Sequence, residues 1–161
     1  MPGGATSQEP TMSHEENAML ELVRELAMFF GKDNLTVAEV TTRVGAVERD
    51  PGIPLPIGLV PAPPGLRSAQ LGRYPDSGLP YVLILEPAVA SRPTVGSLKV
   101  AFGQYKRALT GRGHAKELIF PPLASGTRWR VVLVVNVEEG ASDLDSARIT
   151  RITFRRDPIA N

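Results

Sequence analysis

The sequence predicts an α+β protein in which a mainly antiparallel sheet of about five strands packs against three helices on one of its faces. Two patterns support this fold class. Three segments have helix signals, and five other segments have the composition of strands. In addition, one short helical segment recurs later in the chain, each time with strand-forming residues after it.

The composition limits the class of protein. The chain has 161 residues, of which 42% are hydrophobic and 22% charged, as in a typical soluble globular protein. This length fits a single domain, which we expect over residues 13–157. Residues 1–12 are small, polar and rich in Pro and Gly, so we expect a disordered tail. The chain has no Cys, which excludes disulfides and cysteine-based metal sites or nucleophiles.

The first helix is predicted over residues 13–30. Ser13 and Glu16 have the spacing of a capping box at its start. Gly31 stands where a glycine commonly ends a helix. The apolar residues that share one face of this helix are Met19, Leu20, Val23, Leu26, Ala27 and Phe30.

A second, shorter helix is predicted over residues 35–45, and it is followed by an unusual segment. Residues 50–65 are dominated by Pro and Gly, which excludes a regular helix and argues against a central strand. The same segment contains Ile53, Leu55, Ile57, Leu59 and Val60, so it is too apolar for a free linker. We expect an extended strap that lies along the body of the protein.

Five later segments read as strands, and a third helix, residues 94–103, lies among them. Pro, Asp, Ser and Gly at residues 75–78 supply a turn between the first two strands, and an acidic turn over residues 138–145 precedes the last. The predicted strands are residues 66–74, 79–86, 117–120, 128–137 and 147–156.

The most informative feature is an internal match at a constant offset between residues 36–45 and residues 94–103. Thr, Val and Gly are identical at their places, and the two intervening apolar positions match in kind. The Thr caps the helix, the apolar residues seat it on a sheet, and the Gly lets the chain turn toward a strand. Because strands follow both copies, the sequence predicts a tandem pseudo-repeat of residues 36–86 and 94–138. Convergence is the alternative, since many short helices begin with Thr and end with Gly.

The segment from Leu35 to Gly45 reads L-T-x-x-x-V-x-x-x-x-G. With the loop and strands after it, this segment resembles the units of the β-lactamase-inhibitory protein family, and it is similar to small outer-membrane lipoproteins that assist barrel assembly. A weaker likeness covers residues 93–103. The resemblance implies helix–helix–sheet units, one or two per chain, that act by gripping other proteins. This chain differs in lacking Cys and a lipoprotein signal.

Two of the predicted strands are apolar at every position, which is unusual for a strand with one solvated face. Residues 81–85 and residues 131–135 should therefore be central strands covered on both faces. The helices can cover one face. The second face must meet the Pro-rich strap, a partner or another copy of the chain, and we expect the strap.

No catalytic constellation is evident. His14 lies in the first helix, and His114 has no identifiable paired nucleophile. Zinc-binding, P-loop, dinucleotide-binding and nucleophile-elbow motifs are absent. The glycine-rich segment of residues 110–113 fits a surface loop better than a phosphate site. The acidic residues of the 138–145 turn lack the spacing of a calcium loop. We therefore expect no catalytic residue, no metal and no cofactor.

The charges are unevenly distributed along the chain. Residues 1–50 carry nine acidic and four basic side chains, and residues 51–161 carry eight acidic and fourteen basic ones. Such asymmetry can mark a binding face, or it can reflect attraction between the two ends of one fold. Arginines on the last strand could contact an acidic protein, protect a sheet edge or pair with carboxylates within the chain. Nucleic acid is not expected, because no aromatic side chains are interleaved with them. The predicted partner-binding residues are Arg73, Tyr74, Asp76, Arg112, Arg128, Arg130, Arg151 and Arg155.

The sequence therefore predicts a non-enzymatic, bacterial protein-binding module, such as an inhibitor, an immunity-type protein or an adaptor, that acts through a sheet surface. Its partner would be another protein with acidic character, or a second copy of the chain bound through a sheet face. The alternative is a small-ligand-binding or enzymatic domain with a pocket between helices and sheet. A self-associating structural component is a third class. The chain start does not resemble a signal peptide, and no apolar run reaches the roughly 18 residues needed to span a membrane, so we expect a cytoplasmic protein.

Overall fold

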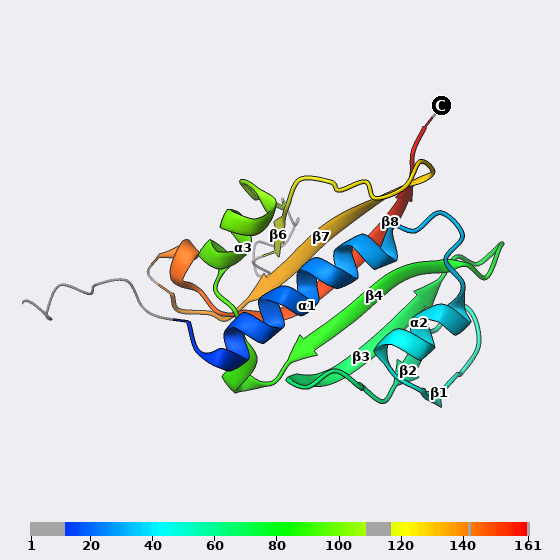
Figure 1. The fold of residues 1–161 in the computed structure, drawn as a ribbon, viewed down its shortest axis with the longest axis horizontal. Coiled ribbons are helices and arrows are strands. Elements are labelled where there is room, and N and C mark those ends of the chain that lie inside the picture. Colours follow the sequence, from blue (N-terminus) through cyan, green and yellow to red (C-terminus); the bar gives the residue numbers. More distant parts are fainter. Residues whose placement is uncertain (1–11, 109–116, 142, 161) are drawn as a thin grey trace, which may run out of the picture.

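A computed structural model describes residues 12–108, 117–141 and 143–160. These residues form an α+β fold with three α-helices and one eight-stranded antiparallel sheet (Figure 1). The predicted fold class is confirmed at this level. The expected number of about five strands is wrong, because three short strands have no recognisable pattern of their own in the sequence.

The three helices all lie over the same face of the sheet. Helix α1, His14–Phe30, runs diagonally across the middle of the sheet, while α2, Val37–Val44, and α3, Val95–Phe102, lie over opposite flanks (Figure 1). Two short 3-10 helices, η2 over Val89–Ser91 and η3 over Leu144–Ser146, lie in connecting segments. Each α-helix begins at a hydroxyl side chain that accepts a backbone N–H, and the cap residues are Ser13, Thr36 and Thr94.

The five strands that the sequence predicts are all present, with ends shifted by a few residues at most. They are β3 (Leu66–Arg73), β4 (Pro80–Pro87), β6 (Glu117–Ile119), β7 (Trp129–Val137) and β8 (Ile149–Pro158). The last strand is not an edge strand, because β8 lies between β4 and β7 at the centre of the sheet. Protection of a sheet edge therefore does not explain its arginines.

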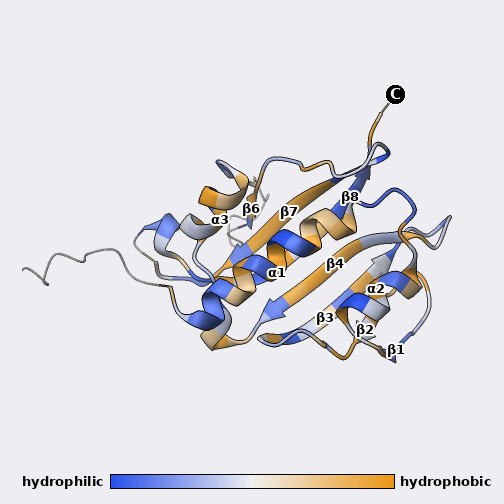
Figure 2. Cartoon of the chain, in the orientation of Figure 1, coloured by the Kyte–Doolittle hydropathy of each residue, from blue (hydrophilic) through white to orange (hydrophobic). Residues whose placement is uncertain are grey.

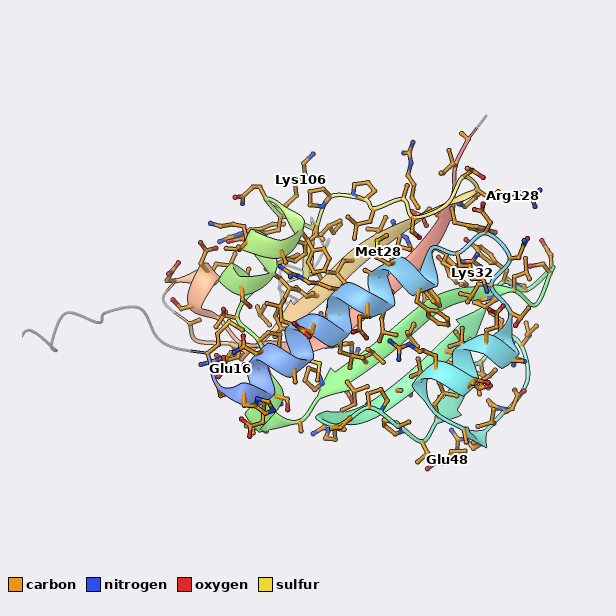
Figure 3. All side chains as sticks on the ribbon, in the orientation of Figure 1. Glu16, Met28, Lys32, Glu48, Lys106 and Arg128 are labelled. Atoms are coloured by element: carbon orange, nitrogen blue, oxygen red, sulfur yellow. The ribbon has the colours of Figure 1, made fainter. Side chains whose placement is uncertain are left out.

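The three additional strands are short and lie at the two edges. They are β1 (Val47–Arg49), β2 (Ile57–Leu59) and β5 (Lys106–Arg107). The sheet order is β1-β2-β3-β4-β8-β7-β6-β5. Figure 3 shows Glu48 and Lys106 at opposite edges of the sheet, which are formed by β1 and β5.

The Pro-rich strap does not cover the second face of the sheet, so that expectation is wrong. Its central residues form β2, which pairs with β3 through Ile57 and Leu71. Ile57 and Leu59 are buried in the core on the helix-covered face. The prolines flank this strand instead of interrupting it, which is why a Pro-rich segment can supply a sheet strand.

The helix-covered face of the sheet forms the core. Along the long strands, alternate residues such as Leu83, Leu85, Leu133 and Val135 have no exposed surface. They belong to one hydrophobic cluster that also includes the inner side of α1. Figure 2 shows hydrophobic segments of β4 and β7 on both sides of this helix. The core therefore continues without interruption from one flank of the sheet to the other.

The element order repeats within this continuous core. The first unit consists of α2 followed by β1 to β4, and the second unit consists of α3 followed by β5 to β8. Each unit is a helix and a four-stranded antiparallel meander, and the two meanders meet where β4 pairs with β8. The second unit therefore extends to the end of β8, beyond the boundary at residue 138 that the sequence suggests.

The strand register repeats as well. In the first unit, one cross-strand row runs through Ile57, Leu71 and Leu83. In the second unit, the corresponding row runs through Leu118, Val135 and Ile152. Where the units meet, Leu83 lies opposite Phe154 and Leu85 lies opposite Ile152. Exchanging the two units therefore leaves the register unchanged, and the sheet has a pseudo-twofold axis between β4 and β8.

Candidate functional site

The face of the sheet turned away from the helices is the candidate site, and we call it the open face. Its residues alternate with the core residues along each strand. In β4, Leu83 and Leu85 have no exposed surface, whereas Val82 and Ile84 between them are only half buried. In β7, Val134 is half buried between the core residues Leu133 and Val135. The three helices lie on the opposite side, so no described helix covers this face.

A row of three aliphatic residues and one threonine, which we call the apolar row, crosses the open face over four adjacent strands. Ile119, Val134, Thr153 and Ile84 lie opposite one another in β6, β7, β8 and β4. All four are half buried. Sequence reasoning did not include these residues in the site. A signal was nevertheless present, because residues 81–85 and 131–135 are apolar at positions that point to both faces.

At one end of the open face, Glu86 forms ion pairs with two arginines. Its carboxylate accepts a hydrogen bond of 2.7 Å from Ser68 Oγ, and the guanidinium groups of Arg151 and Arg67 lie 3.4 and 3.5 Å away. The Ser68 hydrogen bond, with help from the two arginines, lowers the pKa of Glu86 below its ordinary value. Arg151, a predicted site residue, lies on the open face. Its ion pair with Glu86 balances part of its charge within the chain.

At the other end, Arg155 forms an ion pair within its own strand. Its Nε and Nη2 each lie 2.9 Å from a carboxylate oxygen of Asp157. This hydrogen bonding raises the pKa of Arg155 above its ordinary value. Arg130 lies opposite Asp157 in β7 and is exposed, and it makes no ion pair with any described residue. Arg130, Arg151 and Arg155 are the three predicted site residues that the structure places on one surface.

Two other predicted site residues stabilise the fold. Arg73 donates to both carboxylate oxygens of Asp50, at 2.7 and 3.2 Å, and so connects β3 to the segment after β1. Tyr74 donates its hydroxyl hydrogen to the backbone carbonyl of Arg156, and burial raises the pKa of this tyrosine. The Tyr74 ring also lies 5.7 Å from that of Trp129. These contacts hold both side chains against the fold.

The remaining predicted site residues are scattered. Asp76 is exposed in the turn between β3 and β4, away from the open-face rows. Arg128 is exposed near the end of α1, where Figure 3 shows it on the same side of the molecule as Lys32. Arg112 lies outside the described residues, as does His114. Of the eight predicted residues, the described part of the chain therefore places Arg130, Arg151 and Arg155 on the open face and the other four described ones elsewhere.

The described surface includes three hollows that a small ligand could enter. One, of about 420 Å³, is lined by Trp129, Arg128, Asp33 and neighbouring residues. The carboxylate of Asp33 in it already accepts hydrogen bonds from the backbone N–H groups of Thr127 and Arg128. The second, of about 550 Å³, lies beside Met28, and the third, of about 420 Å³, lies between α1 and α2. All three are open to solvent, and none of them lies between the helices and the sheet.

Comparisons with known proteins add no further information about the site. No protein-family model, curated protein or solved structure matches this chain. Within the described residues, none of the helices combines the length and the apolar character that a membrane crossing requires.

Proposed function

We propose that this chain is a non-enzymatic protein-binding module that docks its partner on the open face of the sheet. The observation that supports the proposal is the apolar row of Ile119, Val134, Thr153 and Ile84, which crosses four strands with no described helix above it. Large apolar areas that remain accessible, with polar residues around them, are typical of protein interaction sites.

The arrangement of the open face suits a rigid docking surface. Its apolar side chains are mostly β-branched, so they lose little side-chain freedom when a partner covers them. Arg151 and Arg155 are already held by Glu86 and Asp157, so ordering them on binding costs little. An inhibitor, an immunity-type protein or an adaptor would use such a surface in the same way.

We further infer that the two units arose by duplication of one helix-and-meander segment. The support is the shared element order together with the equal register of the core rows. The sequence match of residues 36–45 with residues 94–103 is the remnant of the same event. Duplication explains how a short unit obtains a broad sheet, since a single four-stranded meander with one helix would leave its inner edge unpaired.

Peptide selection on the full-length chain tests the proposed function. A displayed library of random peptides is selected on the wild-type chain, and the affinities of the enriched peptides are measured for two variants. Val134→Lys places a charge in the apolar row, and we expect it to weaken binding about tenfold or more. Met28→Lys is the control, because Met28 is 56% exposed on α1 and so belongs to the opposite side of the molecule.

The two variants separate the possible results. Peptides that lose affinity for Val134→Lys and keep it for Met28→Lys support docking on the open face. If the selection enriches no peptide, or if the peptides respond only to Met28→Lys, the proposal is wrong. The amide spectrum of each variant shows in the same samples that the fold is retained.

A further inference from the structure

The pseudo-twofold axis lets each position of the first unit be compared with its equivalent in the second. On the helix-covered face, equivalent positions hold buried apolar residues in both units. Leu71 corresponds to Val135, Leu83 corresponds to Ile152, and Ile57 corresponds to Leu118. All six residues have 1% exposure or less. The two units therefore kept the same requirement for a packed core.

The open face does not follow this pattern. The neighbours of the core residues in the same strands give the equivalent open-face positions. Gly58 in β2 corresponds to Ile119 in β6, and Gln70 in β3 corresponds to Val134 in β7. Two residues earlier in the same two strands, Ser68 corresponds to Val132. In these two strands the second unit thus carries apolar side chains where the first unit carries small or polar ones. The last strands differ in the opposite sense, because Val82 and Ile84 of β4 correspond to Arg151 and Thr153 of β8.

The apolar row ends where this difference begins. Next to Ile84 of β4, the following members of the row are Gln70 and Gly58. Gln70 is exposed, and neither residue offers an apolar side chain. A partner that seeks apolar contact would therefore cover β4, β8, β7 and β6, and would gain little by extending over β3 and β2.

The charges around this apolar area favour a partner that carries negative charge. On the open face, β4 to β8 carry the cations Lys106, Arg130, Arg151 and Arg155 and the carboxylates Glu86, Glu117 and Asp157, which leaves an excess of one cation. Lys106 and Arg130 make no ion pair with described residues. Because these two are exposed and uncompensated, they would attract carboxylates placed around an apolar centre.

We propose that the second unit, together with β4, forms the whole docking surface, and that it binds a protein segment with an apolar centre and acidic flanks. This inference rests on the proposed function and narrows it to one half of the sheet and one kind of partner. A second copy of the chain fits less well, because its open face would carry the same excess of cations as the surface it has to bind. Nucleic acid also fits less well, because the centre of the surface is aliphatic and offers no ring for a base to stack on.

Two designed peptide libraries test the proposal on the full-length chain. Both have the same randomised apolar positions, and the fixed positions between them hold Glu in one library and Lys in the other. We expect the Glu library to yield the tighter binders. Their affinity should fall about tenfold or more for Val134→Gln. This substitution replaces Val134 by the residue type that the first unit carries at the equivalent position, Gln70. The matched control, Gln70→Ala, changes that equivalent position in the first unit and should alter affinity less than about twofold.

Each other outcome overturns a defined part of the proposal. Equal losses for Val134→Gln and Gln70→Ala would mean that the partner covers both units, which contradicts this inference and leaves the proposed function intact. Tighter binding from the Lys library would contradict the acidic partner. Binding that responds to neither variant would contradict the proposed function itself. Tight binding of a single-stranded oligonucleotide, or self-association in sedimentation that Val134→Gln abolishes, would replace the acidic segment by another occupant.

Discussion

Arg156 is a cation inside the core, and its environment explains how the charge is tolerated. Its side chain is 1% exposed, and its guanidinium lies 4.1 Å from the centre of the Trp129 ring. Two of its nitrogens donate to the backbone carbonyls of Pro80 and Lys32, at 3.1 and 2.9 Å. Burial lowers the pKa of this arginine. The side chain thus connects β8 to the start of β4 and to the segment after α1.

Replacing Arg156 by Lys should destabilise the fold by about 1 to 3 kcal/mol. A lysine keeps the positive charge, but it cannot stack as a planar group on Trp129 while donating to two separate carbonyls. Urea denaturation monitored by circular dichroism measures the effect. Arg155→Lys is a matched control on the same strand, because Arg155 is partly exposed and its ion pair with Asp157 should contribute less than about 1 kcal/mol. Equal effects of the two substitutions would contradict this role of Arg156.

Glu86 should make the stability of the fold depend on pH. Its pKa is lowered from the ordinary value of 4.5, first by the hydrogen bond from Ser68 and then by Arg151 and Arg67. The carboxylate therefore stabilises the fold above the unfolded-state pKa, and this contribution disappears as the pH falls through the lower folded-state value. We expect Glu86→Gln to cost about 0.5 to 1 kcal/mol at neutral pH and less at acidic pH. Urea midpoints at several pH values measure this, and a difference that does not change with pH would contradict it.

At the scale of elements, the two helices of the repeat end at glycines for different reasons. An added Cβ at Gly45 would lie 1.9 Å from the carbonyl oxygen of Val60, which is backbone that cannot easily move. At Gly103 the nearest atom would be 3.3 Å away, but the residue has a φ of +103°. The first glycine is required by the close approach of the strap, and the second by its backbone conformation.

We expect both glycines to be sensitive to substitution. Gly45→Ala should cost about 2 kcal/mol or more, because the clash is with backbone. Gly103→Ala should cost about 1 to 3 kcal/mol from backbone strain. Thermal denaturation of the two variants measures these costs. Gly58→Ala is the control, since its added methyl would approach no atom closer than 3.8 Å and its φ is not positive, so little loss is expected. A tolerated Gly45→Ala would show that the strap can move away from α2.

The elements that the sequence predicts are those that contain their own signal. The three α-helices have caps and apolar stripes, and the long strands β3, β4, β7 and β8 have enough apolar residues to be recognised. The missed strands β1, β2 and β5 have two or three residues each. They form because a neighbouring strand offers unpaired backbone groups, and such a partner is created only by the tertiary fold. The position of the strap in the sheet, instead of over it, follows from the same cause.

At the scale of the whole molecule, the sequence predicted that the candidate site is a sheet surface, but it did not predict which side chains share that surface. Sequence reasoning placed it on a sheet surface, and it identified the strands that are apolar toward both faces. It also chose Arg73 as an interface residue, although Asp50 holds its guanidinium within the fold. Which side chains share a surface depends on strand register and sheet order, and the pairing of β4 with β8 joins residues far apart in the chain.

The pairing of β4 with β8 also predicts that the two units unfold together. Leu83 of the first unit lies opposite Phe154 of the second beneath α1, and both have no exposed surface. Leu83→Ala should therefore cost about 2 to 5 kcal/mol, and it should lower the urea midpoint reported by Trp129 in the second unit as much as that reported by circular dichroism. Leu55→Ala is the control, because Leu55 is 56% exposed and should change stability by less than about 0.5 kcal/mol. If the Trp129 midpoint stayed unchanged in Leu83→Ala, the second unit would be stable without the first, and the shared core would not couple them.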